Sequence, residues 1–126
     1  MDDNAYKQEL RKRAERQKVL DRIVNAAVAC VLDRIRDRPP PILSHLFYGA
    51  SAIHPKHLVT WYLFKGDSDL ATARASGLTT AIDNLTRAEL ERAGYPAEGL
   101  QLMQVAFTSD EDIQRTAGGN YWAYFK

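Results

Sequence analysis

Cysteine is nearly absent from this chain of 126 residues, which contains Cys30 and no other. A single cysteine cannot form an intrachain disulfide, and it cannot supply a thiolate-rich metal site. Long apolar runs are also missing, because no stretch reaches about eighteen apolar residues and the first residues are charged. We therefore expect neither a membrane-spanning helix nor a secretory signal, and we predict a cytoplasmic protein with no membrane partner.

A reaction signature is missing as well. His54 and His57 flank Pro55, and the sequence nominates no third metal ligand, so we keep the two histidines only as weak pocket candidates. The acidic run 110–112 could hold a hard cation, although helix capping is the favoured explanation. Cys30 lies among apolar residues, where we expect a small buried hydrophobe. The sequence thus predicts no catalytic residue, no metal ion and no cofactor, and it favours a binding protein over an enzyme.

The composition is typical of a folded domain, with 45% hydrophobic and 26% charged residues. A chain of this length removes about two thirds of its unfolded surface from water, which is enough for a hydrophobic core. No internal repeat or low-complexity segment divides it. We therefore predict a single domain over residues 1–126.

A long amphipathic helix is predicted at the start of the chain. Its second half carries an apolar stripe on one side, formed by Leu20, Val24, Ala27, Val28, Val31 and Ile35. Three consecutive prolines at 39–41 end this helix near residue 37. Upstream, Arg13 and Gln17 interrupt the stripe, so we expect residues 1–18 to form a solvent-exposed basic helical extension.

Alternating apolar patterns predict two strands, at residues 57–65 and 100–108, and the aromatic segment 120–126 predicts a third. Residues 42–56 fit a short helix and a short strand equally well, so their structure stays open. Three strands among several helices favour the α+β class. We predict a small three-stranded, mainly antiparallel sheet covered by helices, with the long amphipathic helix at its N-terminus.

Helices are predicted between and after these strands. Residues 68–85 repeat apolar side chains at three- and four-residue intervals, and Gly77 either packs against another backbone or splits this helix in two. Thr86 and Glu89 have the spacing of a capping box, which predicts a second helix start. Ser109 is placed to cap a short helix that follows the second strand.

Aromatic side chains are concentrated in two of the predicted strands. They lie on both strand faces and exceed what one layer of helices would cover, so part of them is expected at the surface. The candidate interaction surface comprises Trp61, Tyr62, Phe64, Tyr121, Trp122 and Tyr124.

Charge is unevenly distributed, although the chain as a whole carries only +1. Residues 1–38 sum to +3 and residues 66–126 to −4. On the helical wheel a candidate basic face gathers Lys7, Arg11, Lys18 and Arg22. Glu15 and Asp21 lie on or beside this face and weaken it, so nucleic acid is a possible partner that we do not favour.

These features predict a small cytoplasmic protein-protein interaction module, of the kind found among inhibitor or immunity proteins that mask a basic surface with carboxylates. The first alternative is a nucleic-acid or ribosome-associated factor that uses the basic helix. The second is a small-molecule binder or enzyme with a cleft near the histidines and the aromatic strands. We also predict a homodimer, because the apolar stripe is longer than a three-stranded sheet comfortably covers.

Overall fold

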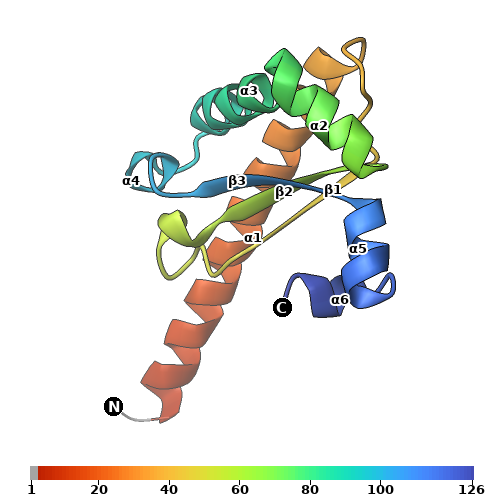
Figure 1. The fold of residues 1–126 in the computed structure, drawn as a ribbon. Helices are drawn as coiled ribbons and strands as arrows, with labels where there is room; N and C mark the ends of the chain where they lie inside the picture. The colour runs from red at the N-terminus through yellow and green to blue at the C-terminus, as the bar shows by residue number, and fades with distance from the viewer. Residues whose placement is uncertain (1–2) are drawn as a thin grey trace.

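The computed structural model describes residues 3–126 and consists of one long helix, a small sheet and several shorter helices (Figure 1). The sheet has three strands in the order β1-β2-β3. In chain order the elements are α1 (Asp3–Ile35), β1 (Ser44–Tyr48), η1 (Pro55–His57), β2 (Val59–Phe64), α2 (Asp67–Ser76), α3 (Leu78–Arg92), α4 (Ala97–Leu100), β3 (Gln104–Ser109), α5 (Asp110–Ala117) and α6 (Tyr121–Tyr124). The predicted α+β class, with a three-stranded sheet covered by helices and a long N-terminal helix, is confirmed.

The sheet is mixed. β1 runs antiparallel to β2, whereas β2 runs parallel to β3. A parallel pair needs a long crossover, and here α2, α3 and α4 supply it. The predicted strands at 57–65 and 100–108 correspond to β2 and β3, and the third strand, β1, comes from the segment whose structure the sequence left open.

The strand predicted for residues 120–126 is wrong, because this segment forms the helical turn α6. Asn120 caps that turn by accepting a hydrogen bond from the backbone N–H of Ala123 (3.0 Å). Gly118 and Gly119 both have positive φ and reverse the chain just before it. The aromatic residues of α6 therefore lie over a face of the sheet and do not add a strand to its edge.

The helix start predicted at Thr86 is also wrong, because Thr86 lies inside α3. Its hydroxyl donates to the carbonyl of Ile82 (2.7 Å) and accepts from the phenol of Tyr62 (2.8 Å). Glu89, the second half of the capping-box pattern, is buried beside Arg34. The helix break occurs instead at Gly77, where φ is +83° and no other backbone approaches, so Gly77 splits the helix.

The hydrophobic core lies between one face of the sheet and the helices α1 and α3. All six residues of the predicted stripe on α1 are buried. They form one cluster with Tyr62 and Phe64 of β2 and with Leu78, Ile82 and Leu90 of α3. The helix ends at Ile35, just before the three prolines, as their restricted backbone requires.

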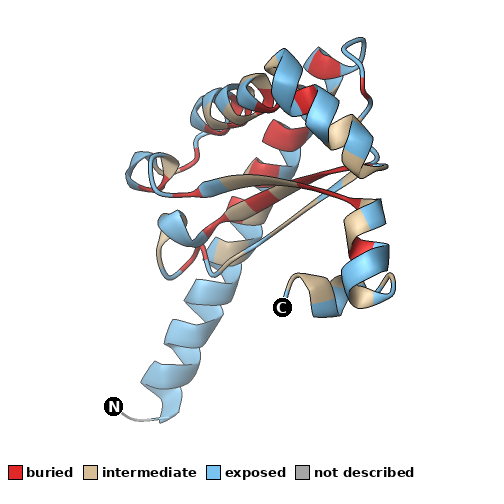
Figure 2. Ribbon diagram, viewed as in Figure 1, coloured by how far each residue is buried: buried red, intermediate tan, exposed pale blue. Residues whose placement is uncertain are grey.

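The first half of α1 extends beyond this core as an arm, defined here as residues 3–18 (Figure 2). Every arm residue except Gln17 is exposed. Gln17 marks the base of the arm, because its amide oxygen accepts from the backbone N–H of Ala52 (3.0 Å). Met1 and Asp2, which the predicted extension included, lie outside the described residues. Within residues 3–126, no helix combines the length and apolar character needed to cross a membrane.

Candidate functional site

An aromatic groove lies between β1 and the C-terminal residues that follow α5. It has a volume of about 390 Å³ and is lined by Leu46, Tyr48, Tyr121, Trp122, Phe125 and Lys126. Trp122 is the most exposed of the large apolar side chains in the described part of the chain, at 80%. The strand β1 beside the groove is an edge strand, since it pairs only with β2.

Edge-to-face ring contacts hold the inner side of the groove in place. The ring of Phe125 lies 5.1 Å from Trp61 and 4.9 Å from Tyr124, at interplanar angles of 62° and 77°. The indole N–H of Trp61 in turn donates to the phenol oxygen of Tyr48 (3.0 Å). Such contacts contribute about 0.5–1.5 kcal/mol per pair beyond burial, so they stabilise the inner wall of the groove.

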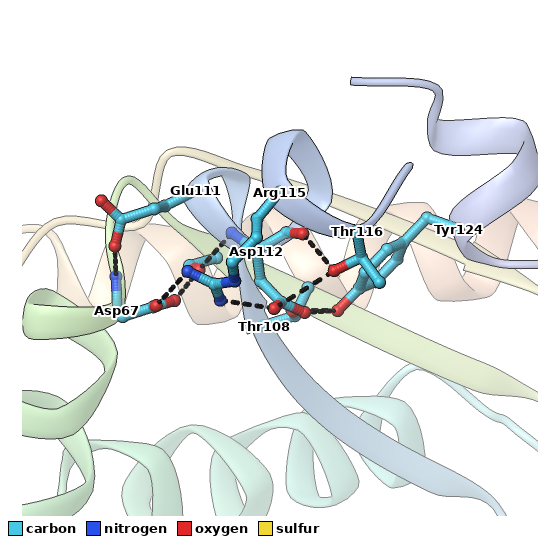
Figure 3. Close-up of polar contacts among 8 residues, drawn as sticks. Asp67, Thr108, Glu111, Asp112, Arg115, Thr116 and Tyr124 are labelled. Atoms are coloured by element: carbon cyan, nitrogen blue, oxygen red, sulfur yellow. Dashed lines mark hydrogen bonds and ion pairs between the residues drawn. The ribbon is translucent and has the colours of Figure 1, made fainter. Parts of the chain in front are cut away.

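Hydrogen bonds from its two tyrosines tie α6 to α5 and β3, and Figure 3 shows those of Tyr124. Tyr124 donates to Asp112 and pairs with Thr108 (2.7 Å). Tyr121 donates to Asp110 (2.7 Å). Burial raises the pKa of Tyr124, with a contribution from Asp112, and the hydrogen bond to Asp110 raises the pKa of Tyr121. Both phenols are therefore protonated donors at neutral pH.

Arg115 connects this arrangement to the start of α2. Its guanidinium donates to Asp67 (2.9 Å) and to Asp112 (2.6 Å), as Figure 3 shows. Asp67 also accepts from Ser109 (2.6 Å), and this bond, followed by the one to Arg115, lowers the pKa of Asp67. Hydrogen bonds from Tyr124 and then from Arg115 lower the pKa of Asp112. The hydrogen bonds to Asp67 and then to Asp112 raise the pKa of Arg115.

The acidic run at the start of α5 behaves as predicted for a capped helix. Ser109 accepts from the backbone N–H of Asp112 (3.0 Å) at the N-cap position. Glu111 accepts from the backbone N–H of Asp67 (3.1 Å). Among residues 3–126, no three metal-ligating side chains come together. The run therefore stabilises the junction of β3, α5 and α2, and its carboxylates are occupied within the chain.

Two of the six residues predicted for the interaction surface do not belong to it. Tyr62 and Phe64 are both 0% exposed, because strand alternation turns them toward α1 and α3. Burial raises the pKa of Tyr62 to about 12. Trp61 lies half-buried under Phe125, whereas Tyr121, Trp122 and Tyr124 lie on α6.

The predicted surface did not include four residues that line the groove, Leu46, Tyr48, Phe125 and Lys126. It also did not include Asp67 and Arg115, which brace the groove from behind. Leu46 and Tyr48 lie in the segment left open. Asp67 and Arg115 are 48 positions apart, so no local pattern relates them. The three-residue spacing of Asp112 and Arg115 was the one available signal, since such pairs meet on a helix surface.

His54 and His57 lie beside each other, but among residues 3–126 no third metal-ligating side chain joins them. His54 accepts from the backbone N–H of Lys56 (3.0 Å) and caps η1, and its ring centroid lies 6.3 Å from that of His57. His45 lies on β1 opposite Tyr62. The expectation that Cys30 is buried is wrong, since it is exposed on the side of α1 that the stripe leaves uncovered.

The basic face predicted on α1 is exposed at Lys7, Arg11, Lys18 and Arg22. Lys18 lies 3.8 Å from Glu15, and both side chains are about two-thirds exposed, so this ion pair contributes little.

Comparisons of the chain with family models, with curated proteins and with solved structures found no match. The geometry of its own surfaces is therefore what supports a function.

Proposed function

We propose that this protein is a protein-protein interaction module that binds an extended segment of another protein in the aromatic groove, along the edge of β1. The observation that carries this proposal is the position of the groove directly beside an edge strand. A strand that adds to a sheet edge gains backbone hydrogen bonds, while pockets for alternate side chains supply specificity.

The residues of the groove suit protein recognition. Tyr and Trp are enriched among the residues that contribute most to binding energy, because they bury a large area and lose little conformational freedom. Trp122 is mostly exposed, while Trp61 and Phe125 hold the wall behind it. A groove with few polar groups also fits an apolar peptide segment better than a small polar ligand, which needs convergent hydrogen-bond partners.

The edge of β1 lacks the residue types that usually protect an edge strand. Its five residues, Ser44–Tyr48, include no lysine, no acidic residue and no proline. Proteins normally use such residues to prevent unwanted strand pairing. The absence of lysine, acidic residues and proline from β1 supports the proposal that this edge pairs with a strand of a partner.

An inhibitor or immunity role is a special form of this proposal, in which the partner is an enzyme. The structure gives less support to binding through the carboxylates of the C-terminal half than to binding in the aromatic groove. Asp67 and Asp112 already pair with Arg115, and Asp110 accepts from Tyr121. These carboxylates would have to leave their present partners to meet a basic surface.

Selection from a random peptide library on the full-length protein tests the proposal. We expect enriched peptides with apolar residues at every second position, whose affinity falls by at least about tenfold for Trp122→Ala, since truncation of a central aromatic residue costs about 2 kcal/mol or more. Amide chemical shifts should change over residues 44–48 and at the Trp122 indole.

The matched control is Val19→Ala, which truncates an exposed apolar side chain on α1, outside the groove, and should leave the affinity unchanged. The proposal is wrong if no peptide depends on Trp122, or if the shift changes map to another surface.

A further inference from the structure

The arm presents an apolar face that the rest of the described chain does not cover. Tyr6 and Leu10 are exposed, and each lies eighteen residues, about five helical turns, before a buried stripe residue, Val24 and Val28 respectively. They therefore continue the core-facing side of α1 beyond the core. Ile53 is also exposed, and with Ala52 it lines a hollow of about 350 Å³ whose arm side consists of Glu9, Lys12, Arg13 and Arg16.

The arm is also strongly basic. It carries six basic residues, Lys7, Arg11, Lys12, Arg13, Arg16 and Lys18, against Asp3, Glu9 and Glu15, a net charge of +3. Two arms packed against each other would repel, because like charges along facing helices are destabilising. The complementary surface has to be acidic and partly apolar.

The chain itself provides such a surface where α3 meets α4. A hollow of about 570 Å³ lies there, lined by Arg87, Ala88, Glu91, Ala97, Leu100 and Gln101. We define the ledge as these residues together with Glu98 and Leu102, which are exposed on and just after α4. Leu102 is 63% exposed. Glu91 and Glu98 are exposed and make no ion pair within residues 3–126, unlike Glu89, which pairs with Arg34.

The basic residue at this ledge is already engaged. Arg87 pairs with Asp83 (2.8 Å) and donates to the carbonyls of Leu100 and Met103. The two glutamates therefore set the charge that the ledge offers to a partner.

We propose that the arm docks on the ledge of a second copy of this chain, and that the ledge of the first copy receives the arm of the second. The net charge of +3 on the arm is complementary to the two exposed ledge carboxylates, Glu91 and Glu98, which make no ion pair within residues 3–126. In a two-fold dimer each contact forms twice. Each arm–ledge contact then has to bury only about half of the roughly 1,200–2,000 Å² that a stable interface buries in total on both partners.

Protein is a better occupant of the arm than nucleic acid. Phosphate contacts would leave Tyr6 and Leu10 without a partner, and the three carboxylates of the arm would oppose them. An apolar face flanked by basic residues instead matches a protein surface with apolar side chains and carboxylates.

Reversing the charges on the arm and on the ledge, first separately and then together, tests this dimer. Light scattering and sedimentation measure the mass of each protein. The wild-type chain of 14.2 kDa should associate to twice its mass. The arm variant Lys7→Glu/Arg11→Glu and the ledge variant Glu91→Lys/Glu98→Lys should each weaken self-association by at least about tenfold, since each repeats its reversed charges in both contacts. An equimolar mixture of the two variants, or one chain with all four changes, should associate again. Circular dichroism should show an unchanged fold, because the substituted side chains are exposed.

Arg74→Glu, at an exposed position on α2, is the control and should not alter the dimer. A wild-type chain that stays monomeric at every concentration at which it remains in solution overturns the proposal, and so does a dimer that resists both reversals or a mixture that fails to associate. Binding to duplex RNA that is lost in the arm variant but kept in the ledge variant, without a dimer, would assign the arm to nucleic acid instead.

Discussion

Glu89 is a carboxylate that folding removes from water, with only 3% of its surface left exposed. Burying an isolated charge is costly, and Arg34, whose guanidinium lies 3.2 Å away, compensates it. Arg92 lies further off, at 3.7 Å, and is mostly exposed. The ion pair between Arg34 and Glu89 joins α1 to α3 at the edge of the core. Arg34 therefore stabilises the packing of the two helices, whereas Arg36 does not.

Arg34→Ala should therefore lower the free energy of unfolding by about 2 kcal/mol, because it leaves Glu89 buried with a weaker partner. Arg36→Ala is the matched control on the same helix end. Its pair with Asp33 is exposed on both sides, and its loss should cost less than about 1 kcal/mol. Urea denaturation measures both values, and equal values for the two variants would contradict this assignment.

The C-terminal element α6 is a short helix that depends on contacts to distant parts of the chain. Four residues are too few for a stable isolated helix. Tyr121 and Tyr124 anchor it to α5, while Arg115 joins Asp112 to Asp67 at the start of α2. The shape of the groove therefore follows from polar contacts that lie behind it.

This dependence predicts a loosening of α6 in acid. Asp67 and Asp112 have a lower pKa in the folded protein than their ordinary value of 3.8, so they add stability above that value and lose it as the pH falls through the folded pKa. In a Trp122→Phe protein, Trp61 is the remaining tryptophan, and its fluorescence reports its contact with Phe125. The signal should change below about pH 4.

Arg115→Gln should move the midpoint of this change to higher pH, because the carboxylates lose their cationic partner. Arg74→Gln, on the exposed side of α2, should leave the midpoint in place. An identical midpoint in all three proteins would show that the network does not hold α6.

At the scale of the whole molecule, the protein has two candidate binding surfaces outside its core, the groove and the arm. The groove is formed by β1 and the C-terminal residues, and the arm is formed by the first turns of α1. The arm makes few contacts with the core, so its backbone should open far more easily than the half of α1 that is buried.

The proposed dimer predicts that the rate of amide hydrogen exchange in the arm depends on protein concentration. Amides of residues 3–18 should exchange fast in dilute solution and more slowly as the copies associate, whereas amides of residues 20–35 should stay protected throughout. Exchange in the arm that does not depend on concentration would argue that no second copy covers it.

Local patterns in the sequence determined the elements whose stability depends on near neighbours. The stripe on α1, its end before three prolines, the strands β2 and β3 and the cap at Ser109 all follow from side chains within a few residues of one another. Periodicity and backbone restriction act over that range, so the sequence alone determined the α+β class.

The tertiary structure decided what depends on distant neighbours. The aromatic residues of 120–126 could alternate in a strand or gather on a helical turn. In the structure they form a turn, after which Phe125 packs on Trp61 of β2. Thr86 and Glu89 could cap a helix, but Tyr62 and Arg34 engage them inside α3. The groove exists because residues far apart in the chain meet there, and no local pattern contains that information.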